Sequence, residues 1–325
     1  MTLESSERMT VGQANRARPR RIFLGTLALA LTSSPALATP PACAFQIEAE
    51  AAGGFRVRGG GDCARRPEID AWIRAAARAV TGYYRRFPAR RARVDLGWRA
   101  GGGIGSGTTR VADGLPRIAI ELGRGITARD LEDDWVLTHE MIHLALPDLP
   151  DAHHWLEEGI ATYVEPLARA RAGLVSPDVV FAEWVSEMPK GLPETGDRGL
   201  DRTPTWARTY WGGALFCLLA DVAIRERTGN RFGLESALRA IHEEWGGLER
   251  EAEIGPLLDT GDRAVGGTDL RDLYERFGSR PDAPDLPGLW RRLGLSEDAG
   301  RVRVDDQAPL AAVRRAIVAA PTPRP

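Results

Sequence analysis

The chain has little of several residue types that mark common classes of protein. Its 325 residues include three cysteines, none in a C-x-x-C pair, which argues against a cysteine zinc site. The formal net charge is −2, which provides no basic surface to favour nucleic acid. Past the N-terminal region, no run is apolar enough to span a membrane. The remaining composition, 43% hydrophobic and 27% charged, is that of a globular protein of one large or two ordinary domains.

The N-terminus has the layout of a bacterial export signal. A basic stretch at residues 16–21 precedes an apolar run at 22–31, and a small-x-small pattern ends at Ala38. The run is too short to cross about 30 Å of hydrocarbon, so we expect cleavage after Ala38 and a periplasmic or secreted protein. Residues 20–24 resemble a twin-arginine signal, and an ordinary Sec signal is the alternative.

The three cysteines receive different interpretations. In an oxidising compartment Cys43 and Cys63 are expected to form a disulfide near the start of the mature chain. Cys217 lies in an apolar helical stretch and is predicted to be a buried free thiol.

The strongest chemical signal is an H-E-x-x-H pattern from His139 to His143. On a helix these two imidazoles lie one turn apart on one face. Their nitrogens can therefore reach one metal ion at about 2.0–2.1 Å. Glu140 points to another part of the same site, where it can accept a proton from a metal-activated water. The pattern predicts half of a hydrolytic zinc centre.

A second acidic segment, W-L-E-E-G-I-A-T-Y at residues 155–163, follows after a short turn and can fold back against the first helix. One of its carboxylates can complete a site of two histidines and one glutamate, with an open fourth position for water. Glu157 and Glu158 are adjacent and face about 100° apart on a helix, so both cannot bind one ion equally well.

Together the two segments resemble the gluzincin metallopeptidases of the M1 aminopeptidase and M61 glycyl aminopeptidase type, whose pattern is H-E-x-x-H followed by W-L-x-E-G-x-A-x-Y. The resemblance covers roughly residues 90–245 and implies a zincin-like fold. It implies one Zn²⁺ per chain, bound by His139, His143 and Glu158. Glu140 is then the general base.

A third segment supports this resemblance. Residues 209–215 look like the family's Y-x-x-G-A helix, whose tyrosine hydrogen-bonds the oxyanion of the tetrahedral intermediate. The resemblance assigns that role to Tyr210, because a phenol with a pKa of about 10 stays protonated at neutral pH. The alternative is a tyrosine packed against Trp206 and Trp211. Two features depart from the family: the connection between the motifs is shorter, and the G-x-M-E-N exopeptidase element is missing from the sequence.

Other polar residues receive simpler interpretations. His153 and His154 are expected at a solvated helix entrance, in preference to substrate or metal contact. Glu165 either orients a ligand imidazole or forms a surface salt bridge. Asp134 and His242 are expected on helix surfaces.

Hydrophobic periodicity predicts strands with one helix first, and mostly helices afterwards. Strands are expected at residues 44–48, 55–58, 93–98 and 117–122, and helices at 68–87, 128–146, 154–172, 177–188, 205–228, 232–245 and, with proline-rich breaks, over 250–325. The glycine-rich residues 100–107 predict a loop that binds nothing, since no Lys-Ser/Thr follows. We expect an α+β fold: a zincin-like catalytic subdomain over 39–190 and a helical subdomain over 191–325 that carries Tyr210.

The sequence therefore predicts an exported zinc metallopeptidase that acts on a peptide or protein substrate. One alternative is a peptidase-like module that binds zinc and a partner but cleaves nothing. Glu140 argues against it, because a structural site needs no base. The other is a zinc hydrolase of a non-peptide amide, since such a centre polarises any carbonyl.

Overall fold

The computed structural model describes residues 43–61, 65–298 and 301–320. The predicted export signal and Cys63 lie outside these residues. Cys43 is disulfide-bonded, and Cys217 is a buried free thiol as predicted. Among the described helices, none is long and apolar enough to cross a membrane.

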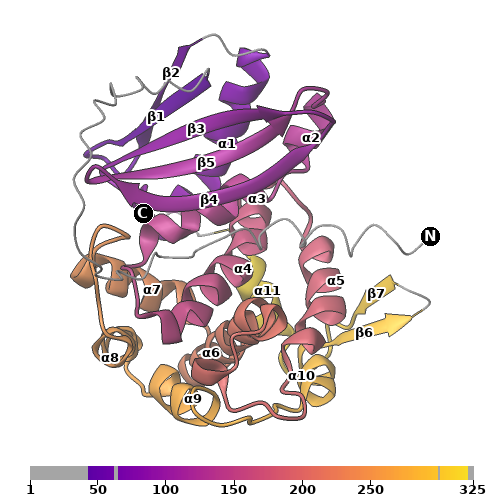
Figure 1. Ribbon diagram of the computed structural model, residues 1–325. Helices are drawn as coiled ribbons and strands as arrows, with labels where there is room; N and C mark the ends of the chain where they lie inside the picture. The colour runs from indigo at the N-terminus through magenta and orange to yellow at the C-terminus, as the bar shows by residue number, and fades with distance from the viewer. Residues whose placement is uncertain (1–42, 62–64, 299–300, 321–325) are drawn as a thin grey trace.

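A five-stranded mixed sheet forms one layer of the molecule (Figure 1). Its order is β2-β1-β3-β5-β4, with β3 and β5 parallel and the other neighbours antiparallel. The strands are β1 Cys43–Ala49, β2 Phe55–Gly61, β3 Arg91–Arg99, β4 Ile104–Ala112 and β5 Leu115–Gly123. β4 therefore forms one edge, and this edge faces the helices (Figure 1).

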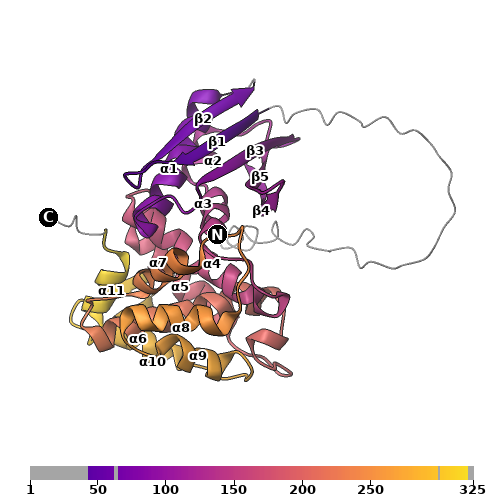
Figure 2. The same cartoon turned by 90° about the vertical axis from the view of Figure 1, so that its left-hand side faces the viewer.

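Most of the helices form a second layer below the sheet, whereas the first helix lies against the sheet itself (Figures 1 and 2). Helix α1 lies between β2 and β3 in the chain, and the other helices and a small hairpin come after β5. Their bounds are α1 Arg66–Tyr84, α2 Ala128–Glu132, α3 Val136–Ile142, α4 His154–Arg171, α5 Pro177–Glu187, α6 Gly213–Thr228, α7 Leu234–Trp245, α8 Ile254–Val265, α9 Asp269–Phe277, α10 Leu286–Leu293, β6 Leu295–Asp298, β7 Arg301–Val304 and α11 Ala311–Val318. The predicted α+β class is confirmed. The proposed boundary at residues 190–191 stays a prediction.

The core lies between the sheet and the helices. α1 buries the apolar face expected from its sequence, including Ile69, Ile73 and Val80. α1 also contacts α3 and α4, which lie deeper in the helical layer. Burial of these side chains stabilises the fold by roughly 25 cal/mol per Å² of apolar surface removed from water. Helix α1 thus connects the sheet to α3 and α4.

The helix predicted over residues 128–146 is interrupted, and Asp134 is the cause. The predicted capping box of Thr127 and Asp130 starts α2, but the helix stops at Glu132. The Asp134 carboxylate then accepts hydrogen bonds from the backbone N–H of Val136 at 2.9 Å and of Leu137 at 3.1 Å. These bonds satisfy backbone N–H groups at the start of a new helix, α3. Asp134 therefore lies half-buried between two helices, and the expectation that it lies on a helix surface was wrong.

The prediction of a loop over the glycine-rich segment is also partly wrong, because strand β4 begins at Ile104. The strand pairs with β5, and its register shifts between Ile104 and Gly107. Such a bulge inserts an unpaired residue and bends the strand. Pairing with β5 supplies the backbone hydrogen bonds, so the low strand propensity of glycine does not prevent the strand.

A close contact between two glycines joins α4 to α6. A Cβ placed on Gly159 would lie 2.3 Å from the carbonyl carbon of Gly213, and one on Gly213 would lie 2.1 Å from the carbonyl oxygen of Trp155. Only glycine permits backbones to approach this closely. The contact explains why glycine stands at position 159, directly after Glu158, and at position 213, three residues after Tyr210.

This contact predicts opposite effects for two glycine-to-alanine substitutions. Gly159→Ala should lower the free energy of unfolding by about 1–3 kcal/mol, the usual cost of overpacking. Gly82→Ala is the matched control, since Gly82 lies in α1 with open space around its Cα. It should raise stability by about 0.5–1 kcal/mol. Urea denaturation of both variants measures this, and equal effects would contradict the close packing.

Candidate metal centre

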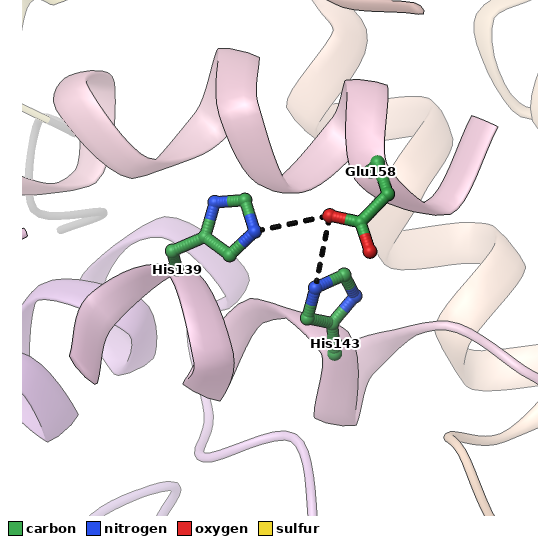
Figure 3. Close-up of side chains that lie close together, drawn as sticks. All are labelled: His139, His143 and Glu158. Atoms are coloured by element: carbon green, nitrogen blue, oxygen red, sulfur yellow. Dashed lines mark hydrogen bonds and ion pairs between the residues drawn. The ribbon is translucent and has the colours of Figure 1, made fainter. Parts of the chain in front are cut away.

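Three predicted site residues converge where α3 meets α4 (Figure 3). His139 lies on α3, His143 begins the 3-10 turn that continues it, and Glu158 lies on α4. The Nε2 atoms of His139 and His143 lie 3.2 and 3.6 Å from Glu158 Oε2. One possible ligand atom from each residue lies within 4.8 Å of those of the other two, so the three residues could hold a metal ion together.

The group is buried, and its charges depend on one another. His139, His143 and Glu158 are 6%, 8% and 6% exposed. Burial lowers the pKa of His139, but its hydrogen bond to Glu158 and the charge of that carboxylate leave the pKa raised. Burial raises the pKa of Glu158, but the His143 and His139 imidazoles hold it well below its usual range. The Glu158 carboxylate is therefore held in its ionised form.

The neighbouring carboxylate, Glu157, is engaged elsewhere. Its Oε1 accepts a hydrogen bond from the backbone N–H of Leu149 at 3.0 Å, and its Oε2 lies 2.8 Å from His154 Nδ1. Glu157 thus holds the turn between the two helices, whereas Glu158 faces the histidines. The geometry favours Glu158 as the third ligand.

His154, which was expected at a solvated helix entrance, contacts this group as well. Its Nε2 lies 3.3 Å from Glu158 Oε1, the carboxylate oxygen that does not face His139 and His143. Partners of this kind orient a ligand carboxylate. The signal was the spacing of His154 and Glu158, one turn apart on the same helix. His153, by contrast, pairs with Asp201 at 3.0 Å, and neither histidine is simply solvated.

The proposed general base, Glu140, lies on α3 between the two histidines and is buried. Its Oε2 accepts a hydrogen bond from Thr109 Oγ1 at 2.6 Å. Its carboxylate therefore has a defined partner on β4.

Tyr210 lies close to the same group, in a π-helical turn over Arg208–Gly212 that leads into α6. Its ring stacks on His139, with centroids 6.4 Å apart and planes 21° apart, and on Trp206 at 6.1 Å. The aromatic packing foreseen as an alternative is present for Trp206, but it also sets Tyr210 against a candidate ligand. Turns of this type occur frequently at functional sites.

A cavity of about 90 Å³ opens beside His139 and Tyr210. Its walls are mainly apolar and include the rings of Trp135 and Trp206. Thr162 also lines it, and its hydroxyl is buried without a hydrogen-bond partner. A space of this size suits one aliphatic side chain or a few waters.

Two further expectations need correction. Glu165 forms a buried ion pair with Arg169 at 2.9 Å instead of a surface one, and its charge contributes to the raised pKa of His139. His242 is buried, and its Nδ1 donates to the Ala145 carbonyl at 3.0 Å. The acidic neighbours of His242 in sequence suggested the surface, but the long-range carbonyl partner keeps it inside.

Comparisons with known proteins agree with this geometry at the level of the fold. No protein-family model matches the sequence, and a search of curated proteins finds no relative. A crystal structure of an aminopeptidase N family protein from Idiomarina loihiensis is similar, with a TM-score of 0.50 and 14% identity over 77% of this chain and 49% of that one. The M1 zinc metallopeptidase from Deinococcus radiodurans has a TM-score of 0.48 and 18% identity over 75% and 53%.

The chain therefore shares the fold of this aminopeptidase N family structure, in agreement with the zincin-like fold that the sequence resemblance implied. It spans about half the length of the structures that it matches, 49% and 53% of the two chains. The likeness concerns the fold, and the chemistry has to be argued from the residues themselves.

Substitution of the two adjacent glutamates tests which one binds metal. Glu158→Gln should weaken Zn²⁺ binding by more than the roughly 10–100-fold that loss of an outer-shell partner costs. Glu157→Gln should retain binding, because its amide oxygen can still accept from Leu149. Competition with a fluorescent zinc chelator measures both affinities. Loss of Zn²⁺ from Glu157→Gln alone would reverse the assignment.

Proposed function

We propose that this chain is an exported, zinc-dependent metallopeptidase that hydrolyses peptide bonds. The observation that carries the proposal is the convergence of His139, His143 and Glu158, with Glu140 on the same helix as the two histidines. The M1-type fold supports it, because fold and site point to the same class of chemistry.

The residues present fit one zinc ion. Two imidazoles and one carboxylate are the donor set of open, catalytic zinc sites, which leave a position for water. Structural zinc sites are usually closed by four protein ligands instead. When bound, zinc supplies a Lewis acid and lowers the pKa of a coordinated water towards about 7.

The protein's own groups divide the remaining work. Glu140 accepts the proton of the attacking water and passes it to the leaving amine. The Tyr210 hydroxyl donates a hydrogen bond to the oxyanion that develops on the substrate carbonyl. The apolar cavity beside His139 and Tyr210 offers a place for a substrate side chain next to the reacting bond.

Two other functions remain to be separated from this one. In a silent zinc-binding module the buried Glu140 would have no task. A zinc hydrolase of a non-peptide amide would use the same groups on a different carbonyl. The peptidase is favoured over both, because the M1-type fold is shared with zinc metallopeptidases.

Cleavage of a diverse peptide mixture, read by mass spectrometry, tests the function. The protein would be expressed with its N-terminal segment, and the secreted or periplasmic form purified. We expect cleavage by the untreated protein and none after chelation. The new termini show whether the protein trims ends or cuts inside. Zinc bound at one per chain without any cleavage would favour the other two functions.

Glu140→Gln should remove the general base and leave the metal site intact. We expect the rate to fall at least about 100-fold, the low end for loss of a general base. Zinc content should stay at that of the wild type, because Glu140 is outside the ligand group. Steady-state kinetics with metal analysis measures both, and near-normal turnover would exclude Glu140 from this role.

Tyr210→Phe should lower kcat with little change in KM, because a hydrogen bond made only to the oxyanion stabilises the transition state alone. The expected loss is on the order of 100-fold, as for one oxyanion donor. The ring stacked on His139 is retained in this variant, so zinc content serves as the control. A change confined to KM would show that Tyr210 binds substrate instead.

A further inference from the structure

Strand β4 forms the surface against which the Glu140 side chain packs. A Cβ placed on Gly107 would lie 2.6 Å from Glu140 Cγ and 2.9 Å from Glu140 Oε1. Any residue larger than glycine would therefore displace the carboxylate. The absence of a side chain at Gly107 creates the space that Glu140 fills.

The hydroxyl of Thr109 holds that carboxylate from the same strand. Thr109 lies two residues beyond Gly107, so both face the same side of β4. Its Oγ1 donates to Glu140 Oε2 at 2.6 Å and also lies 2.9 Å from the Glu140 backbone carbonyl oxygen. A distance of 2.6 Å lies at the short end of the range for hydrogen bonds between a hydroxyl and an oxygen.

The bulge in β4 falls at this point of the strand. The register with β5 shifts between Ile104 and Gly107, directly before the two residues that meet Glu140. Bulges re-aim the side chains that follow them and are frequent near active sites. Thr109 is only 2% exposed, so its hydroxyl is shielded from water that would compete for the bond. Its branched Cβ restricts rotation of that hydroxyl.

From these contacts we infer that Thr109 is a positioning residue for Glu140, and that Gly107 provides the space in which it does so. The inference rests on the proposed function for its kinetic consequence, because Glu140 is the base of that reaction. Thr109 fixes Oε2 and leaves Oε1 to receive the proton from water.

Three threonine substitutions on β4 test the inference. Thr109→Val keeps the shape and removes the hydroxyl, and Thr109→Ser keeps the hydroxyl. Thr108→Val is the matched control, since Thr108 is the adjacent, exposed residue on the opposite side of the strand. All three are purified as the full exported protein, loaded with Zn²⁺, and assayed for kcat, KM and zinc content.

We expect Thr109→Val to lower kcat by about 10–100-fold, the range for loss of a supporting partner at a site. KM and zinc content should stay within about twofold of wild type, because substrate and metal contacts are untouched. Thr109→Ser should recover most of the rate, and Thr108→Val should match wild type. A Thr109→Val variant with normal kcat overturns the inference, as does a Thr109→Ser variant that is equally slow.

Crystal structures of zinc-loaded wild type and Thr109→Val give a readout that needs no turnover. We expect the Glu140 carboxylate to leave its position, or to occupy several, in the variant. An unchanged Glu140 overturns the positioning role whether or not peptides are cleaved. If the wild type cleaves nothing, the proposed function fails by itself, and the two structures still decide what Thr109 does.

Discussion

Burial of the Glu158 carboxylate is the constraint around which this site is arranged. An ionised carboxylate away from water is costly unless it is paired and hydrogen-bonded. Here the partners come from two sides: His139 and His143 at one oxygen and His154 at the other. These partners lie on the short α3, on the turn after it and at the start of α4. The same carboxylate therefore contacts all three segments.

The same helix end is held by contacts that take no part in the metal group. Glu157 binds the turn at Leu149, and Gly159 allows α6 to approach within backbone contact. Three consecutive residues of α4 therefore have three separate tasks: one closes the turn, one faces the histidines and one admits the next helix. The approach of α6 in turn brings Tyr210 against His139.

Much of this could be predicted from sequence, because the decisive signals are local. Helical spacing placed His139 and His143 on one face, and the α+β order of elements followed from periodicity. The break at Asp134 was missed, since its carboxylate competes for backbone N–H groups that the apolar pattern does not reveal. The roles of Thr109 and His242 depend on partners far away in sequence. Strand β4 was missed in part because glycine has a low strand propensity. Its glycines allow the strand to approach α3 closely, which the sequence pattern does not reveal.

The π-helical turn at Arg208–Gly212 makes the direction of the Tyr210 ring depend on chain length as well as on residue identity. A π turn contains one residue more than an α turn, and each residue of a helix corresponds to about 100° of rotation. Removal of one residue between Tyr210 and the start of α6 would rotate the tyrosine by about 100° relative to that helix and turn its ring away from His139, with every side chain of the site still encoded. A related chain could thus lose this contact through a single deletion that a comparison of motif residues would not detect.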